Sequence, residues 1–261
     1  MGEQAIMRRE SRSRLATLLC LMVLATASSN ACAAQSPEYI TEAIEYDTRW
    51  ERDRKRDQTS KPAEILPFTG LKPGMQVLDL FAGGGYWSEI FSRVVGPSGK
   101  VVAHTNAAFR KFSREQADQR FADNRLSNVE ILLSEMNDLQ LGHERFDLIF
   151  LGLVYHDLYF HAAFWPQPGR DYFLAQLHAA LKPGGKLVII DHAAAEGTGA
   201  QHAQDLHRID KLFARRGIEA RGFTFEAEIQ ALVNSDDDHT LSVFDDKIRR
   251  RTDRFVYRFA K

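Results

Sequence analysis

Cysteine is scarce in this chain of 261 residues, which has only Cys20 and Cys32. Two cysteines exclude a small fold held together by a dense set of disulfides. An excess of charge of one sign is also missing, because 34 lysines and arginines face 35 aspartates and glutamates. This balance gives no general basicity for binding nucleic acid. The sequence also lacks the repeated apolar runs of about 20 residues that a multi-span membrane protein needs.

The N-terminal segment has the three parts of a secretory signal peptide. Four arginines precede an uncharged, apolar run of 13 residues at 15–27, and a stretch of small residues follows at 31–34. The run is shorter than a membrane-spanning helix requires, so we expect residues 1–34 to be cleaved and the mature chain to keep no stable membrane span. A retained anchor, or a true start at Met7, is the alternative.

Cleavage would change the chemistry of the chain. It would remove both cysteines, four arginines and two glutamates, leaving 30 basic and 33 acidic residues and a net charge of −3. A chain without cysteine cannot form wrong disulfides in an oxidising compartment. We therefore expect an exported, periplasmic protein.

The rest of the chain divides into a charged segment and one domain. Residues 35–61 alternate basic and acidic side chains, which is typical of a solvated helix face. From residue 62 to residue 261, apolar runs of strand length alternate with helical patterns, which predicts an α/β domain with a doubly wound, mostly parallel sheet. We expect seven strands, at 75–81, 100–104, 129–133, 146–153, 186–191, 223–229 and 255–259, of which the last two form a terminal antiparallel pair. We expect helices at 86–95, 107–123, 171–181 and 204–216.

A glycine-rich loop lies where the first strand turns into the first helix. It reads Asp79-Leu80-Phe81-Ala82-Gly83-Gly84-Gly85-Tyr86. Glycines let the backbone approach a ligand closely, and the first N–H groups of the following helix point at it. The carboxylate of Asp79 is expected to orient the loop by accepting its backbone N–H groups. The spacing Gly83-x-Gly85-x-x-Ser88 approaches a dinucleotide-binding fingerprint, but no acid follows about 20 residues later to hold a ribose.

A second interpretation of this loop covers more of the chain. The stretch VLDLFAGGGYWSEIFSRVVGPSGKVV, followed by FDLIFLGL and LKPGGKLVIID, resembles class I S-adenosylmethionine-dependent methyltransferases. The stretches KPAEIL, VYHDLY, DHAA, HRID and SVFD…TDRF are similar to a bacterial group known as predicted methyltransferases, whose members often carry signal peptides. The resemblance implies a Rossmann-like fold, S-adenosylmethionine as cofactor and a small-molecule acceptor.

The resemblance also implies which residues hold the cofactor, and two of them depart from the family pattern. Phe81 stands where the usual loop has its first glycine. Thr105, followed by Asn106, stands where an acid normally binds both ribose hydroxyls in a charge-assisted pair. Asn137 and Asp138, after the third strand, are expected near the adenine. The expected cofactor-binding residues are therefore Asp79, Phe81, Gly83, Gly84, Gly85, Tyr86, Thr105, Asn106, Asn137 and Asp138.

Aspartates and histidines follow the fourth and fifth strands. His156 and Asp157 come after the fourth strand, and Asp191 and His192 end the fifth. The carboxyl ends of neighbouring parallel strands meet at one edge of a sheet, so we expect these four side chains on the cofactor rim as catalytic residues. His207 and Asp210, three residues apart on the expected helix, would share one of its faces.

Three interpretations of this rim stay open. His156 or His192 is a general base, because imidazole titrates near neutral pH. Alternatively, Asp157, Asp191 and His192 hold a divalent metal that lowers the pKa of an acceptor hydroxyl. In the third interpretation, the acids cap helices and the histidines only fill polar positions. A non-catalytic periplasmic binding protein on the same fold, or a metal-assisted enzyme of another class, is the alternative to methyl transfer, because fold does not fix function.

Overall fold

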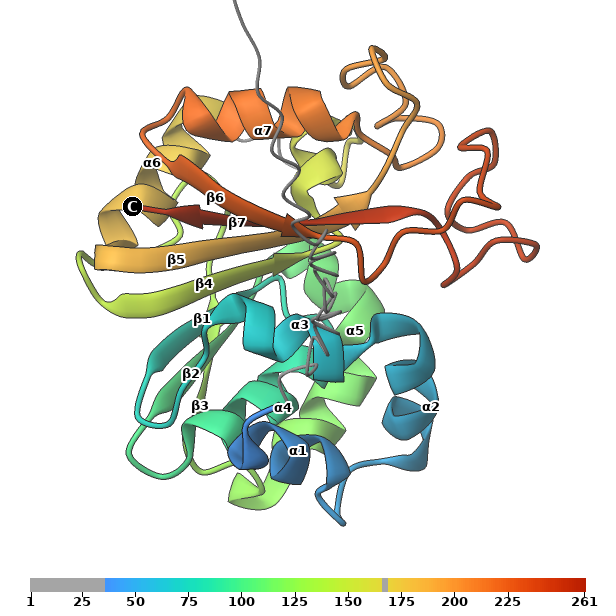
Figure 1. The fold of residues 1–261 in the computed structure, drawn as a ribbon. Coiled ribbons are helices and arrows are strands. Elements are labelled where there is room, and N and C mark those ends of the chain that lie inside the picture. Colours follow the sequence, from blue (N-terminus) through green and yellow to red (C-terminus); the bar gives the residue numbers. More distant parts are fainter. Residues whose placement is uncertain (1–35, 166–168) are drawn as a thin grey trace, which may run out of the picture. The chain divides into compact units, whose positions relative to one another are not determined.

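The core of the protein is a seven-stranded sheet with strand order β3-β2-β1-β4-β5-β7-β6 (Figure 1). The structure is a computed structural model that describes residues 36–165 and 169–261. The expected signal peptide lies outside these residues. The strands are β1 (Gln76–Leu80), β2 (Lys100–Thr105), β3 (Val129–Leu133), β4 (Phe146–Gly152), β5 (Leu181–His192), β6 (Thr224–Ile229) and β7 (Arg254–Ala260).

The first five strands are parallel, and β7 pairs antiparallel with both β5 and β6. This confirms the predicted fold class. The direction of strand order reverses between β1 and β4, because β2 and β3 extend the sheet on one side and β5 extends it on the other. In open α/β sheets, ligands bind outside the carboxyl ends of the strands at this switch point.

Helices cover both faces of the sheet. The α-helices are α1 (Glu38–Glu45), α2 (Glu51–Ser60), α3 (Pro62–Thr69), α4 (Tyr86–Val95), α5 (Ala107–Phe121), α6 (Arg170–Ala180) and α7 (Lys211–Glu219). Two short 3-10 helices, η1 (Ala122–Asn124) and η2 (Tyr155–Tyr159), follow α5 and β4. Figure 1 shows α7 on one side of the sheet and α1, α3 and α4 on the other.

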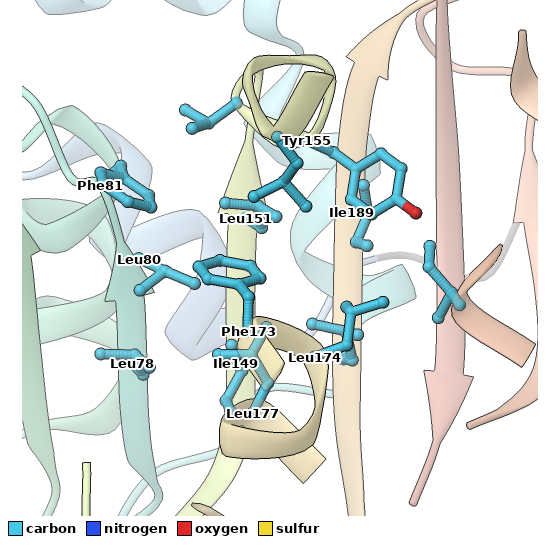
Figure 2. Packing of buried hydrophobic residues seen from close by; sticks show 14 of the residues in the cluster. Leu78, Leu80, Phe81, Ile149, Leu151, Tyr155, Phe173, Leu174, Leu177 and Ile189 are labelled. Carbon is cyan, nitrogen blue, oxygen red and sulfur yellow. The ribbon is translucent and has the colours of Figure 1, made fainter. Parts of the chain in front are cut away.

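The alternation of side chains along each strand produces two separate cores. Leu78 and Leu80 of β1 pack on the α6 and α7 side with Phe173 and Leu177, as Figure 2 shows. Val77, the residue before Leu78, belongs to the core on the opposite face, under α1, α3 and α4. The near-continuous apolar runs of the sequence are thus explained by strands that are buried on both faces.

Two sequence expectations about helices are wrong. The predicted helix at 204–216 begins only at Lys211, because Asp210 caps it by accepting hydrogen bonds from the N–H groups of Leu212 and Phe213. The charged segment before residue 62 is not only a solvated face. Arg49 and Asp53 are buried there, and Arg49 pairs with Asp57 through two 2.8 Å bonds.

Candidate active site

The glycine-rich loop connects β1 to α4 at the switch point of the sheet. Phe81, Gly83 and Gly85 have φ angles of 57°, 58° and 78°, in the left-handed region that favours glycine. Phe81 therefore takes a backbone conformation that favours glycine and that is strained for a bulky side chain. Its ring is buried against Trp165 and other rings of the core, and this packing offsets the strain.

Asp79 does not contact the loop amides as the sequence suggested. Its carboxylate accepts a 2.5 Å hydrogen bond from the Ser88 hydroxyl and so fixes the first turn of α4 instead. Burial raises the pKa of Asp79 to about 7, although the Ser88 bond and the charge of Arg56 act against the rise. The Tyr86 hydroxyl also bonds to another part of the protein, because it donates a 2.6 Å hydrogen bond to Asp57 of α2.

His104, in β2, is a residue that the sequence analysis missed. Its Nδ1 accepts a 3.4 Å bond from the N–H of Phe81, and its Nε2 lies 3.1 Å from the carbonyl oxygen of Ser134, after β3. The carbonyl of His104 also accepts a bond from the N–H of Ala82. A neutral ring that donates from Nε2 satisfies both contacts, so His104 ties the loop to the ends of β2 and β3.

Beyond the ends of β2 and β3, two buried polar atoms have no hydrogen-bond partner in the described part of the chain. The Asn106 side chain caps α5 through Oδ1, which accepts a 2.7 Å bond from the N–H of Phe109, and its Nδ2 is left over. Glu135 accepts a bond from the N–H of Ala107 through Oε1, and its Oε2 is left over. A buried donor and a buried acceptor without partners are costly, and a bound ligand would satisfy them.

The other residues expected at this end of the cofactor are Thr105, Asn137 and Asp138. Thr105 turns its hydroxyl back to the carbonyl of Asn106, at 3.4 Å. Asn137 and Asp138 are exposed in the turn after Glu135. Glu135 was missed by the sequence analysis, although an acid so soon after the third strand was a usable signal.

Helix α5 covers the glycine loop in this conformation. A Cβ built on Gly84 would lie 2.5 Å from Oε1 of Gln116, and one on Gly85 would lie 2.6 Å from the ring of Phe121. The cavity between the loop and α5 measures only about 20 Å³. Arg120 holds the end of this helix in place, since its Nε donates a 2.6 Å bond to the carbonyl of Gly84 and its guanidinium pairs with Glu89 and Asp53.

The Asp/His rim assembles at the ends of β4 and β5 as the sequence predicted. Asp191 is fully buried and accepts three 2.7 Å bonds, from the backbone N–H groups of His156 and His192 and from Nδ1 of His156. On the other side of the His156 ring, Nε2 lies 3.3 Å from Oδ1 of Asp157 and 3.3 Å from Nδ1 of His207. The indole N–H of Trp165 donates to the carbonyl of Asp157, and its ring packs on Phe81, so the rim and the loop are in contact through one side chain.

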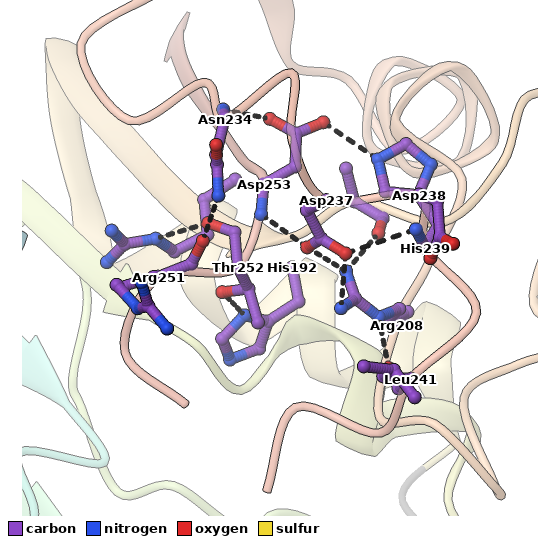
Figure 3. A network of polar contacts seen from close by, with 12 residues as sticks. His192, Arg208, Asn234, Asp237, Asp238, His239, Leu241, Arg251, Thr252 and Asp253 are labelled. Carbon is purple, nitrogen blue, oxygen red and sulfur yellow. Dashed lines mark hydrogen bonds and ion pairs between the residues drawn. The ribbon is translucent and has the colours of Figure 1, made fainter. Parts of the chain in front are cut away.

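His207 and Asp210 do not share a helix face. His207 lies in the loop before α7 with a φ of 56°, and its ring contacts His156, whereas Asp210 is occupied as the cap of α7. The loop of His207 is fixed by the fully buried Arg208, whose guanidinium pairs with Asp237 and donates to the carbonyls of Ala193 and Leu241 (Figure 3).

Comparison with known proteins decides the family. The family model described as "Methyltransferase domain" matches residues 71–229, which is more than half of the chain. This chain belongs to the methyltransferase-domain family. It is 27% identical over 146 residues to the ubiquinone/menaquinone biosynthesis C-methyltransferase UbiE of Hahella chejuensis, which is 55% of this chain and 53% of that protein. The chain therefore spans about half the length of the curated relatives it matches.

Two solved structures share the fold of this methyltransferase domain. A SAM-dependent methyltransferase from Aquifex aeolicus aligns with a TM-score of 0.55 and 23% identity over 81% of this chain and 99% of that one. The arsenic(III) S-adenosylmethionine methyltransferase CrArsM from Chlamydomonas reinhardtii aligns with a TM-score of 0.53 and 16% identity over 86% and 73% of the two chains.

The two histidines proposed as general bases of the methyltransferase domain differ in charge. Burial lowers the pKa of His156, but the carboxylates of Asp191 and Asp157 outweigh it and raise the pKa to about 10. His156 is therefore an imidazolium at neutral pH and has no free lone pair for a proton. Burial, together with the nearby charges of His156 and Arg254, lowers the pKa of His192 well below its usual value, so this ring is neutral.

A basic groove lies between the end of α2, the segment after β6 and the segment that leads into β7. It has a volume of about 500 Å³, and its lining includes five basic side chains, Lys61, Lys247, Arg250, Arg251 and Arg254. Arg254 is buried, and burial together with the charge of Arg56 lowers its pKa to about 10. Its guanidinium donates to the carbonyls of Thr252 and Thr59, and among the described residues it has no carboxylate partner.

Proposed function

We propose that the protein transfers a methyl group from S-adenosylmethionine to a small-molecule acceptor. Membership of the methyltransferase-domain family and the glycine loop at the switch point of the sheet support this function. The observation that carries it is the pair of unsatisfied atoms beyond β2 and β3, Asn106 Nδ2 and Glu135 Oε2. A donor and an acceptor left over there fit a nucleoside, which brings ribose hydroxyls and an adenine amino group.

Different residues of the chain would bind different parts of the cofactor. The loop of Gly83–Gly85 would hold the amino-acid end of the cofactor, Asn106 the ribose and Glu135 the adenine. When bound, the cofactor supplies a methyl group on a sulfonium, which is already a good leaving group. The protein then has to orient the acceptor and exclude water. Because α5 fills the space over the loop, we expect this helix to shift when the cofactor enters.

The rim supplies the base that a protonated acceptor requires. His192 is neutral, its Nδ1 contacts the Thr252 hydroxyl at 2.7 Å, and Nε2 has no hydrogen-bond partner among the described residues. We therefore assign proton removal to His192 rather than to His156. The basic groove and the unpaired Arg254 next to this rim favour an acceptor that carries a negative charge, such as a carboxylate or a phosphate.

Calorimetric titration of the full-length protein with S-adenosylmethionine and with S-adenosylhomocysteine tests the proposal. We expect saturable binding of both, weakened about tenfold or more in Glu135→Leu, which removes the unsatisfied acceptor. Glu144→Leu, at an exposed position before β4 and outside the expected cofactor-binding residues, is the matched control and should bind like the wild type. No binding at millimolar ligand by a folded protein would overturn the cofactor assignment.

A second experiment separates an enzyme from a binding protein on the same fold. Purified protein is incubated with methyl-labelled cofactor and a small-molecule fraction of cell extract, and labelled products are separated by charge. We expect an anionic labelled product that is reduced about 10²-fold or more in His192→Gln, the size typical of a lost general base. Binding of cofactor without any labelled product would favour the non-catalytic alternative.

A further inference from the structure

We propose that His156, Asp157 and His207 form a binding site for one divalent cation of the zinc type. This inference is independent of the proposed methyl transfer, because it concerns a different set of atoms from those that would hold the cofactor. These ligands differ from the three metal ligands expected from the sequence, which were Asp157, Asp191 and His192. Of those three, only Asp157 presents an atom to the new site.

The first argument is the spacing of the three ligand atoms. Nε2 of His156 lies 3.3 Å from Nδ1 of His207 and 3.3 Å from Oδ1 of Asp157, and the remaining side of the triangle is 3.6 Å. Zinc binds nitrogen and oxygen at about 2.0–2.2 Å in a tetrahedron, which places neighbouring ligand atoms about 3.3–3.6 Å apart. The triangle therefore matches one face of a tetrahedral site, and a cation that binds there displaces the proton that Nε2 of His156 carries at neutral pH.

The second argument is the environment of His156. Its Nδ1 contacts Oδ1 of Asp191 at 2.7 Å, and Asp191 is itself fixed by two backbone N–H groups. Metal-binding histidines characteristically donate their other ring nitrogen to a carboxylate, which fixes the ring and makes the free nitrogen a better ligand. Asp191 thus orients His156 toward the site and is not itself a ligand.

The third argument is that His207 has a strained backbone and is held in place by its neighbours. Its backbone is in the left-handed region, with a φ of 56°, which is costly for a residue with a Cβ. Its ring lies between those of Phe160 and Phe244, each with a centroid 4.8 Å away. The neighbouring Arg208 anchors this segment through Asp237 and two backbone carbonyls (Figure 3).

Access and ligand type complete the assignment. The side chains of Asp157 and His207 are 15% and 20% exposed, whereas that of His156 is 4% exposed, so the fourth position faces the accessible side. Two imidazoles and one carboxylate suit zinc, whereas magnesium and calcium prefer oxygen ligands throughout. Three protein ligands and one free position are the composition of catalytic rather than structural zinc sites.

Calorimetric titration of full-length, tag-free protein with Zn²⁺, after treatment with a chelator, tests the site. We expect one Zn²⁺ per chain, at least tenfold weaker binding in both His207→Ala and Asp157→Ala, and about 10–100-fold weaker binding in Asp191→Asn. Mg²⁺ should not compete. His202→Ala removes a more exposed histidine that pairs with Asp205 near the site, and this control should bind Zn²⁺ like the wild type.

Thermal unfolding of each metal-free variant separates loss of ligands from loss of fold. The proposal requires that the metal-free His207→Ala protein unfolds within a few degrees of the wild type and gains less thermal stability from Zn²⁺. Co²⁺ provides a second readout, because a four-coordinate site gives it intense visible absorption, which His207→Ala should abolish. The absence of Zn²⁺ binding up to millimolar concentration, or equal binding by wild type and His207→Ala, would overturn the site.

Discussion

At the scale of single residues, the glycine loop is held in place by Phe81 and His104. Phe81 adopts a left-handed backbone conformation, and the ring of His104 lies 4.8 Å from the Phe81 ring, edge to face. The same histidine accepts the N–H of Phe81 and contacts the carbonyl of Ser134. The conformation of the loop therefore depends on His104 remaining neutral, because a protonated ring cannot accept the N–H of Phe81.

The neutral state of His104 predicts how the stability of the protein changes with pH. Burial lowers the pKa of His104 to about 4, while a histidine in the unfolded chain titrates near 6.5. Between these values the ring binds more protons in the unfolded chain, so the contribution of His104 to the free energy of unfolding falls as the pH falls from about 6.5 to 4. The full contribution is present above pH 6.5, and about 3 kcal/mol is lost by pH 4.

Chemical denaturation from pH 4 to pH 8 measures this effect. His104→Gln keeps a donor and an acceptor but does not titrate, so its free energy of unfolding relative to the wild type should rise by about 3 kcal/mol as the pH is lowered from 6.5 to 4. His143→Gln changes an exposed histidine and should leave the pH profile unchanged. Parallel profiles for wild type and His104→Gln would show that His104 is not held neutral.

At the scale of elements, α5 covers the glycine loop, which is the proposed cofactor site. Among the described residues of this helix only Ala108 and Arg120 are buried, and it lies on the glycine loop instead of covering β3. Ile131 and Leu133 of β3 are consequently about half exposed. These two side chains offer α5 a second apolar packing surface, so a shift of α5 away from the loop does not leave it without contacts.

Gln116 is the residue of α5 whose side chain lies directly over Gly84 of the glycine loop. A closed conformation lowers the apparent affinity for a ligand, because only the open fraction of the protein binds it. Gln116→Ala removes the side chain over Gly84, and we expect it to bind S-adenosylhomocysteine about three- to tenfold more tightly than the wild type. Calorimetric titration measures this change.

Gln119→Ala is the matched control for this prediction. The Gln119 side chain is exposed, and its amide donates a hydrogen bond to Glu115 of the same helix, so the affinity for S-adenosylhomocysteine should stay within about twofold of the wild type. A Gln116→Ala protein that binds the ligand no better, or more weakly, would mean that α5 does not compete with the cofactor for the loop.

The elements also show where sequence reasoning succeeds and where it ends. The parallel strands are predictable because burial on both faces makes them continuous apolar runs bounded by turns, and β3 and α4 have the predicted bounds. The rim of His156 and Asp191 is predictable from the rule that carboxyl ends of parallel strands meet. The contact of His207 with His156 is not, because His207 reaches the rim on an irregular loop that a buried ion pair positions. The position of α5 is not predictable either. The helix has few apolar side chains, so the sequence does not indicate which of its faces is buried.

At the scale of the whole molecule, the packed structure is compatible with removal of the N-terminal segment. Among the described residues, the first to be buried are Ile40 and Ala43 of α1, which pack against the core under α3 and α4. No helix in the described part of the chain is both long and apolar enough to cross a membrane. A chain cut after Ala33 or Ala34 therefore keeps every packed helix and strand of the described fold.

We propose on this basis that the protein is exported and that its mature form begins at Ala34 or Gln35. Intact mass and N-terminal sequencing of the protein recovered from the periplasm of an expressing bacterium test this directly. Leu19→Arg places a charge in the middle of the apolar run, which disfavours recognition as a signal peptide, so this variant should stay unprocessed in the cytosol. Asp47→Arg introduces the same charge at an exposed position of the described fold and should be exported and cut normally. A wild-type protein that keeps residues 1–34 and remains in the cytosol would contradict export and would place the proposed methyl transfer where S-adenosylmethionine is made.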